Sequence, residues 1–186
     1  MVKRKTSAQL GSALFLLLGS GIVFLTGRSL ARRIIKRLIT RKFPTVEWIT
    51  TEEFARWLED SAKRLPILLD ARSEAEYAVS HLKHSQRIDP NQPDLAAFTE
   101  SKDTPIVVYC SVGYRSARIA EQLGQAGFSC VYNLKGSIFQ WANEGRPVCK
   151  DDHPTMLVHP YDALWGRLLR SEYRAQVAQG GERERC

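Results

Sequence analysis

The chain has 186 residues, which leaves room for one domain of ordinary size with an appendage but not for two full domains. Its formal charge of +7 would suit a nucleic-acid partner, but residues 1–42 hold ten Lys or Arg and no acid, whereas residues 43–186 hold seventeen against twenty acids. The body therefore carries a charge of −3 and has no basic stretch interleaved with aromatic residues, so no nucleic-acid partner is predicted.

An uncharged run of twenty-two residues near the N-terminus, residues 6–27, is long enough to cross a membrane. As a helix rising about 1.5 Å per residue it would span roughly 33 Å, against a hydrocarbon core of roughly 30 Å. We expect an uncleaved transmembrane helix. A cleaved secretory signal and an organelle transit peptide are the alternatives, but the run passes into Arg28 without a small-residue cleavage site, and it is apolar all round rather than amphipathic.

A basic segment follows this run and completes an N-terminal region of residues 1–43. Residues 28–42 hold seven Lys or Arg, against three ahead of the run. By the positive-inside tendency the rest of the chain is expected on the cytoplasmic or an equivalent side of the membrane. The segment is also amphipathic, and two interpretations stay open: it lies on anionic lipid, or it is a solvated basic linker.

Strand and helix patterns alternate through residues 44–148, which we expect to form the folded domain. Capping boxes at Thr50-x-x-Glu53 and Ser73-x-x-Glu76 indicate two helix starts. Predicted strands cover 46–49, 67–69, 106–109 and 129–132, and the other predicted helices cover 94–100, 116 to a stop at Gly127, and 137–143. This alternation predicts an α/β sandwich with a mostly parallel central sheet flanked by helices.

Asp70 and Arg72 follow the second predicted strand, at the edge of the sheet where ligands bind in open parallel sheets. They would either hold neighbouring loops by ion pairing or touch substrate, and we expect the structural role because a buried acid needs a fixed partner. His81 and His84 lack metal-ligand spacing, so we interpret them as loop-fixing or solvated rather than catalytic.

The run IVVYCSVGYRSAR at residues 106–118 carries the clearest chemical signal. A buried strand ends at Cys110, and the helix pattern resumes a few residues later. Ser111 and Gly113 are small or permissive enough to let backbone N–H groups turn toward the Cys110 sulfur, at the positive end of that helix. Together with the nearby cation Arg115 this favours a thiolate, the nucleophilic form of cysteine. A structural core cysteine is the alternative, but it does not explain the Gly, Ser and Arg clustered just after it.

The other three cysteines are Cys130, Cys149 and Cys186. Since the four show neither C-x-x-C pairing nor histidines at ligand spacing, we predict no metal, no cofactor and no disulfide framework.

Residues 149–186 are expected to form a helical tail with a disordered end. The apolar residues Leu164, Trp165, Leu168 and Leu169 would share one helical face, which packs on the domain or takes a partner; packing is the expectation.

Three pieces of the domain, LLDARSEAEYAVSHL, VVYCSVGYRSARIAEQLGQAGF and VYNLKGSIFQWANEGRPV, resemble the single-domain rhodanese-like sulfurtransferases in order and spacing. With the N-terminal run, the chain looks like a membrane-anchored type of that family. The resemblance spans 44–148 and implies a rhodanese-like sandwich. It departs at three turn positions, where Ser80, His84 and Ser137 replace usual glycines, and these put loop shape in question more than activity.

The resemblance implies a sulfurtransferase that takes a sulfane sulfur from an anionic donor such as thiosulfate onto Cys110 as a persulfide and passes it to a thiol or cyanide acceptor. The loop that would cradle it holds Ser111, Val112, Gly113, Tyr114, Arg115 and Ser116, with Asp70 and Arg72 in support. Two alternatives stay open: a phosphatase or arsenate reductase on the same fold, and a catalytically silent binding module at the membrane. The four residues between Cys110 and Arg115, one fewer than in those phosphatases and reductases, favour sulfur over a tetrahedral oxyanion.

Overall fold

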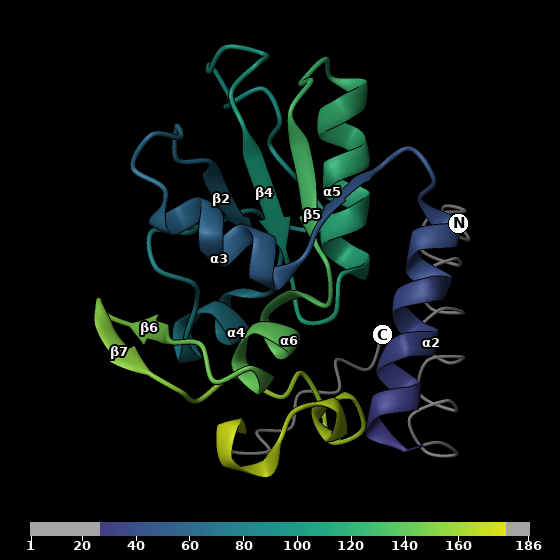
Figure 1. Ribbon diagram of the computed structural model, residues 1–186, viewed down its shortest axis with the longest axis vertical. Coiled ribbons are helices and arrows are strands. Elements are labelled where there is room, and N and C mark those ends of the chain that lie inside the picture. The colour runs from purple at the N-terminus through teal and green to yellow at the C-terminus, as the bar shows by residue number, and fades with distance from the viewer. Residues whose placement is uncertain (1–26, 178–186) are drawn as a thin grey trace, which may run out of the picture.

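A five-stranded sheet runs through the centre of the computed structural model, which describes residues 27–177 (Figure 1). The strand order is β1-β5-β4-β2-β3, and every neighbouring pair is parallel. The central strand β4 is fully buried, as expected for a strand of a parallel sheet that is covered on both faces. The strands are β1 (Glu47–Ile49), β2 (Ile67–Asp70), β3 (Gln86–Arg87), β4 (Ile106–Tyr109) and β5 (Val131–Leu134). The predicted α/β architecture with its parallel sheet is confirmed.

The helices between the strands pack on this sheet. Figure 1 shows α3 crossing in front of the strands and α5 alongside β5. Both predicted capping boxes are present, with Glu53 and Glu76 as the third helical residues. The helices of the domain are α3 (Thr51–Glu59), α4 (Glu74–Val79), α5 (Tyr114–Gln125) and α6 (Ser137–Asn143).

The helix predicted at residues 94–100 is wrong. The segment forms turns between β3 and β4, and the Asp94 carboxylate accepts a hydrogen bond from the Ala97 N–H without a helix following. Leu95 and Phe98 still pack against the core. These two core contacts account for the apolar spacing that suggested a helix. A seven-residue stretch just after Pro93 is too short to sustain a helix without more packing.

The carboxyl ends of the strands bring distant residues to one edge of the sheet. Asp70 pairs in register with Tyr109, and Val108 with Asn133. Residues that follow these strands therefore lie at the same edge, which places Cys110 near the loop that leads into α6.

Asp70 and Arg72 form an ion pair that is completely buried. The guanidinium donates to the Asp70 carboxylate at 2.9 and 2.6 Å and to the Ser80 carbonyl at 2.6 Å, and its carbon lies 5.8 Å from the centre of the Tyr109 ring. The pair thus ties the end of β2 to the end of α4. Such a contact is what the expected loop-holding role requires.

A further helix, α2 (Arg28–Lys42), covers one side of the domain (Figure 1). Ala31, Ile35 and Ile39 recur every four residues and are at most 2 % exposed, so this face packs on the domain. Neither of the two interpretations of the basic segment, a helix on anionic lipid or a solvated linker, included packing on the domain. Its outer side still exposes Arg33 and Arg37.

The tail packs on the domain as predicted, but it is not an α-helix. Its ordered part consists of an antiparallel hairpin and two short 3-10 helices, and Leu168 and Leu169 are buried. The boundary that we drew after residue 148 falls inside the first strand of this hairpin. The elements are β6 (Val148–Lys150), β7 (His153–Thr155), η1 (Trp165–Leu168) and η2 (Ser171–Tyr173).

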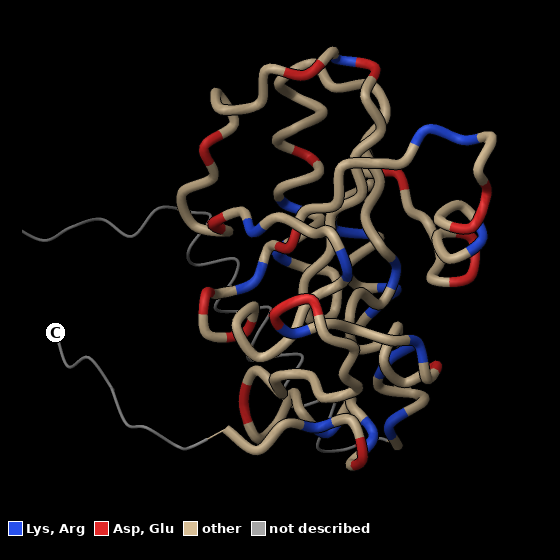
Figure 2. The backbone as a smooth tube through the Cα atoms, turned by 90° about the vertical axis from the view of Figure 1, so that its left-hand side faces the viewer, with Lys and Arg blue, Asp and Glu red and all other residues tan. Residues whose placement is uncertain are grey.

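The transmembrane helix predicted at 6–27 and the disordered end predicted beyond the tail lie almost wholly outside the described residues. Within residues 27–177 no helix is long and apolar enough to cross a bilayer. Figure 2 shows acidic and basic residues interspersed over the domain, in keeping with its small net charge.

Replacing Arg72 by Met should lower the free energy of unfolding by about 3–5 kcal/mol, because it leaves the Asp70 carboxylate buried without a counter-charge. Urea unfolding at pH 7 measures this. The double variant Asp70→Asn, Arg72→Met leaves no buried charge and should lose less than Arg72→Met alone. An equal or greater loss in the double variant would show that the loss in Arg72→Met does not come from leaving the Asp70 charge unpaired.

Candidate active site

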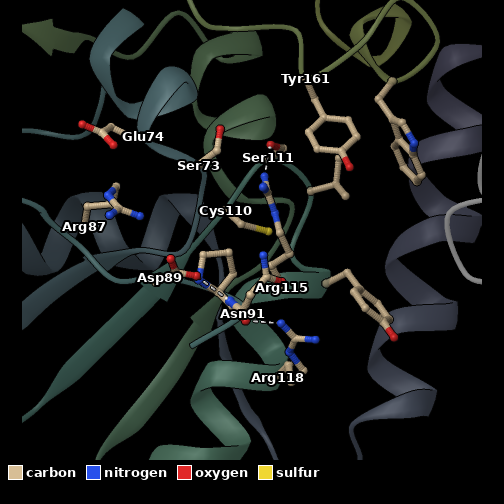
Figure 3. A pocket seen from close by; sticks show the side chains of 14 residues that line it. Ser73, Glu74, Arg87, Asp89, Asn91, Cys110, Ser111, Arg115, Arg118 and Tyr161 are labelled. Atoms are coloured by element: carbon tan, nitrogen blue, oxygen red, sulfur yellow. Dashed lines mark hydrogen bonds between the residues drawn. The ribbon is translucent and has the colours of Figure 1, made fainter. Parts of the chain in front are cut away.

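A cavity of about 370 Å³ opens at the carboxyl edge of the sheet, with Cys110 in its wall (Figure 3). Its lining comes from the Cys110 loop, from α4 and α5, from the segment around Asp89 and from the C-terminal tail. In Figure 3 the Cys110 sulfur lies between Ser111 and Arg115. The cavity therefore joins the predicted cysteine loop to segments that the sequence did not connect with it.

The loop after β4 is folded around the sulfur. Gly113 has φ +111°, a left-handed conformation that glycine adopts without strain, and this turns its N–H toward Sγ at 3.1 Å. The turn also lets α5 begin at Tyr114, two residues earlier than predicted. The Ser116 hydroxyl, in the first turn of that helix, donates to Sγ at 3.4 Å. Two donors thus point at the sulfur from one end of the helix.

These contacts favour the thiolate form of Cys110. Burial of the thiol opposes ionisation and by itself would raise the pKa. The Arg115 charge and the hydrogen bonds from Ser116 and Gly113 outweigh burial, and the pKa of Cys110 lies below its ordinary value. By contrast, burial raises the pKa of the Cys149 thiol.

The Glu76 carboxylate holds the loop in place, and the sequence indicated it only as a helix cap. It accepts two hydrogen bonds from the Arg115 guanidinium, at 2.7 and 2.8 Å, and one from the Ser111 hydroxyl at 2.8 Å. It also accepts from the Ser73 N–H at 3.0 Å. Burial by itself would raise the pKa of Glu76, but the bonds from Arg115 and Ser73 lower it to about 2. Arg115 is therefore a paired cation, and its charge is compensated within the site.

The turn before α6 supports the loop from behind. Gly136 and Ser137 have φ of +82° and +54°. The Ser137 hydroxyl accepts a hydrogen bond from the Cys110 N–H at 3.1 Å and donates to the Leu134 carbonyl at 3.2 Å. Ser137 and His84, which has φ +62°, thus stand at left-handed positions. This is the physical reason why glycine is usual there.

Asp70 and Arg72 are not among the residues that line the cavity. Their ion pair contacts the end of α4 through the hydrogen bond from Arg72 to the Ser80 carbonyl, and the Arg72 charge helps to lower the pKa of Glu76. They support the element that carries Glu76 and remain candidates for a supporting role.

The tail contributes Tyr161 and Trp165 to the wall, and sequence reasoning missed both. The Tyr161 ring lies 5.1 Å from the Arg115 guanidinium carbon, a cation–π distance. Trp165 was predicted only as part of an apolar packing face. A left-handed Tyr161, with φ +67°, has no signature in the sequence.

No group of His, Cys, Asp or Glu side chains within residues 27–177 is arranged to hold a metal ion. The other described cysteines, Cys130 and Cys149, are unpaired by disulfides and lie outside the cavity.

A family model described as the rhodanese-like domain matches residues 50–144. A sulfurtransferase of Allochromatium vinosum is 31 % identical over 103 residues, which cover 55 % of this chain and 94 % of that protein. The thiosulfate sulfurtransferase GlpE of Pseudomonas fluorescens is 32 % identical over 93 residues, covering 48 % of this chain and 85 % of that protein.

A solved structure from Rhodopseudomonas palustris, titled a protein of unknown function and possible tyrosine phosphatase, superposes with a TM-score of 0.51. It covers 67 % of this chain and 96 % of that one, at 20 % identity. This likeness concerns the fold alone. The family match ends before β6, so the tail that carries Tyr161 and Trp165 lies outside it.

Replacing Glu76 by Gln should lower the free energy of unfolding at pH 7 by about 3 kcal/mol, from the depression of its pKa to about 2. Because the folded-state pKa is lowered, the stabilisation is complete above about pH 4.5 and is lost as the pH falls toward 2. Wild type and variant should therefore converge over that range in urea unfolding.

The matched control is Glu52→Gln, which alters an exposed pair with Arg56 at 3.9 Å and should cost less than about 0.5 kcal/mol. A Glu76→Gln difference that stays constant from pH 7 to pH 3 would contradict the assignment of a paired, ionised Glu76.

Proposed function

The chain belongs to the family of rhodanese-like domains, and on that basis we propose that it is a sulfurtransferase that carries a sulfane sulfur as a persulfide on Cys110. The observation that carries the proposal is the pair of donors, the Gly113 N–H and the Ser116 hydroxyl, aimed at the Cys110 sulfur inside an accessible cavity. Such a site stabilises negative charge on sulfur both before and after transfer.

In the first half-reaction the Cys110 thiolate attacks the outer sulfur of an anionic donor, for which thiosulfate is the simplest choice. A new S–S bond forms to Cys110, the S–S bond of thiosulfate breaks, and sulfite leaves with the bonding electron pair. The Gly113 N–H and the Ser116 hydroxyl offset the negative charge on the sulfur at Cys110 throughout this step. The reaction needs neither metal nor cofactor.

In the second half-reaction a thiolate or cyanide attacks the terminal sulfur of the persulfide. The Cys110–S bond breaks and its electron pair returns to the Cys110 thiolate, which the same hydrogen bonds again stabilise. Both half-reactions thus leave one negative charge at the same place, so a rigid loop serves both. Glu76 and Arg115 supply that rigidity, because their bidentate ion pair fixes the loop to α4.

The length of the loop supports sulfur transfer over phosphate hydrolysis. Four residues separate Cys110 from Arg115, and both guanidinium nitrogens that would clamp the oxygens of a tetrahedral anion are engaged by Glu76. A persulfide presents only one terminal sulfur and does not need that clamp.

We expect Cys110→Ser to reduce the formation of thiocyanate from thiosulfate and cyanide below about a thousandth of the wild-type rate, because Cys110 is the only cysteine of residues 27–177 that lines the cavity. Cys130→Ser and Cys149→Ser should keep most of the activity, since both lie outside the cavity. Loss of turnover in either control, or hydrolysis of aryl phosphates faster than sulfur transfer by the wild type, would overturn the assignment.

We further propose that residues 6–27 anchor the chain in a membrane and that the domain faces the cytoplasmic or an equivalent side. The support is the uncharged run and the seven basic residues that follow it. In sealed vesicles with the cytoplasmic side inside, added protease should leave the domain intact, and detergent should expose it. Digestion without detergent, or a mature chain that begins after residue 27, would refute this topology.

A further inference from the structure

The cavity at Cys110 is much larger than the transferred sulfur requires. Its volume of about 370 Å³ is within the range of roughly 300–1,000 Å³ typical of sites for small organic molecules. Cyanide and a single sulfur atom would leave most of it empty. The remaining volume is bounded by the tail, by α5, by the start of α4 and by residues of the segment 87–91.

Hydrogen bonds and burial fix the part of the cavity wall that the tail forms. The Asp162 carboxylate accepts hydrogen bonds from the N–H groups of Leu164 and Trp165 at 2.8 and 2.7 Å, which fixes the turn after Tyr161. Trp165 is only 3 % exposed. Further along, the buried Asn143 amide donates to the Leu168 carbonyl at 2.9 Å. The aromatic wall is therefore held in position before any ligand binds.

Tyr161 adopts its left-handed backbone at the mouth of the cavity. A non-glycine residue is strained in this region and persists only where its surroundings impose it. Here the Tyr161 ring lies over the Arg115 guanidinium. Burial raises the pKa of the Tyr161 hydroxyl against the lowering effect of the Arg115 charge. Tyr161 thus covers the Arg115 guanidinium from the side of the tail.

Three arginines line the cavity, and their charges are compensated to different degrees. Arg115 is paired with Glu76. Arg87 lies beside Asp89, whose pKa it helps to lower, after the hydrogen bond from the Asn91 N–H and in spite of slight burial. Neither Arg87 nor Arg118 has a carboxylate within 4.0 Å among residues 27–177, but the Arg118 guanidinium is held in place by the hydrogen bond that it donates to the Pro90 carbonyl.

Arg118 also lies close to Arg115 in the lining of the cavity. It is three residues after Arg115 and therefore on the same face of α5, and Figure 3 shows its guanidinium below Arg115 in the cavity wall. The Pro90 carbonyl holds the side chain without neutralising it. An anion that enters the cavity would find this charge already held in place.

We propose that Arg118 and the aromatic wall of Tyr161 and Trp165 form an acceptor subsite for a small organic thiol that bears a carboxylate. Arg118 binds the carboxylate, the wall packs on the organic part, and the thiolate sulfur reaches the Cys110 persulfide. The thiolate attacks the terminal sulfur, the Cys110–S bond breaks, and Cys110 leaves as the thiolate while the acceptor becomes a persulfide. This subsite rests on the proposed sulfurtransferase function and names the class of its acceptor.

The test separates the acceptor step from the donor step. The full chain is loaded with thiosulfate, freed of excess donor, and mixed with glutathione or with glutathione diethyl ester, which has the same thiol and organic body but no carboxylate. Mass spectrometry follows the loss of sulfur from Cys110. The wild type should discharge faster to glutathione than to the ester at subsaturating concentration.

Arg118→Gln should slow discharge to glutathione on the order of tenfold, the effect of one charge-assisted hydrogen bond, and leave discharge to the ester unchanged. Arg118→Lys should recover part of the rate. Tyr161→Leu should slow both acceptors, because they share the organic body. Arg56→Ala, which changes an exposed arginine on α3, serves as the matched control and should behave as the wild type.

Equal discharge of the loaded wild type to glutathione and its ester would overturn the subsite and leave the sulfurtransferase function standing. Faster discharge to the cysteine of reduced thioredoxin than to glutathione would likewise overturn it, in favour of a protein acceptor. If thiosulfate loads no sulfur on Cys110, the proposed function fails, and the subsite fails with it.

Discussion

The bidentate ion pair between Glu76 and Arg115 is the interaction on which the site depends. It joins α4 to the first turn of α5, and the Ser111 hydroxyl bonds to both partners, at 2.8 Å to Glu76 and 2.9 Å to Arg115. Glu76 is buried and Arg115 is partly buried, so the pair is costly to desolvate and contributes only when its geometry is nearly ideal. Here the pair fixes the loop, so the hydrogen-bond donors to the Cys110 sulfur need not reorganise during the reaction.

Segments outside the family match enclose this loop on both sides. The Phe43 ring, just beyond α2, packs edge-on against Tyr114 at 5.5 Å, and Lys42 lies 5.5 Å from the centre of the same ring. From the other side the tail sets Tyr161 over Arg115. The Arg32 guanidinium donates to the Leu168 carbonyl at 3.2 Å and so links the two segments directly. The basic helix, the tail and the loop thus form one packed unit.

The sequence predicts what depends on local pattern. The parallel sheet, both capping boxes and the thiolate loop around Cys110 follow from apolar runs, cap residues and a permissive glycine. It does not predict what depends on long-range packing: Glu76 reads as a helix cap, although it also binds Arg115, thirty-nine residues away. The Tyr161 wall arises from a strained turn in the tail, and the false helix at 94–100 from apolar residues that pack without helical structure.

The central claim, that Cys110 is a preorganised thiolate that accepts a sulfane sulfur, is tested most directly by intact-mass spectrometry of the full chain after brief treatment with thiosulfate. We expect the gain of one sulfur atom, mapped to Cys110 by digestion, and its complete loss on adding cyanide. Unchanged mass at a thiosulfate concentration that sustains turnover in other sulfurtransferases, or a gain that maps to Cys130 or Cys149, would contradict it.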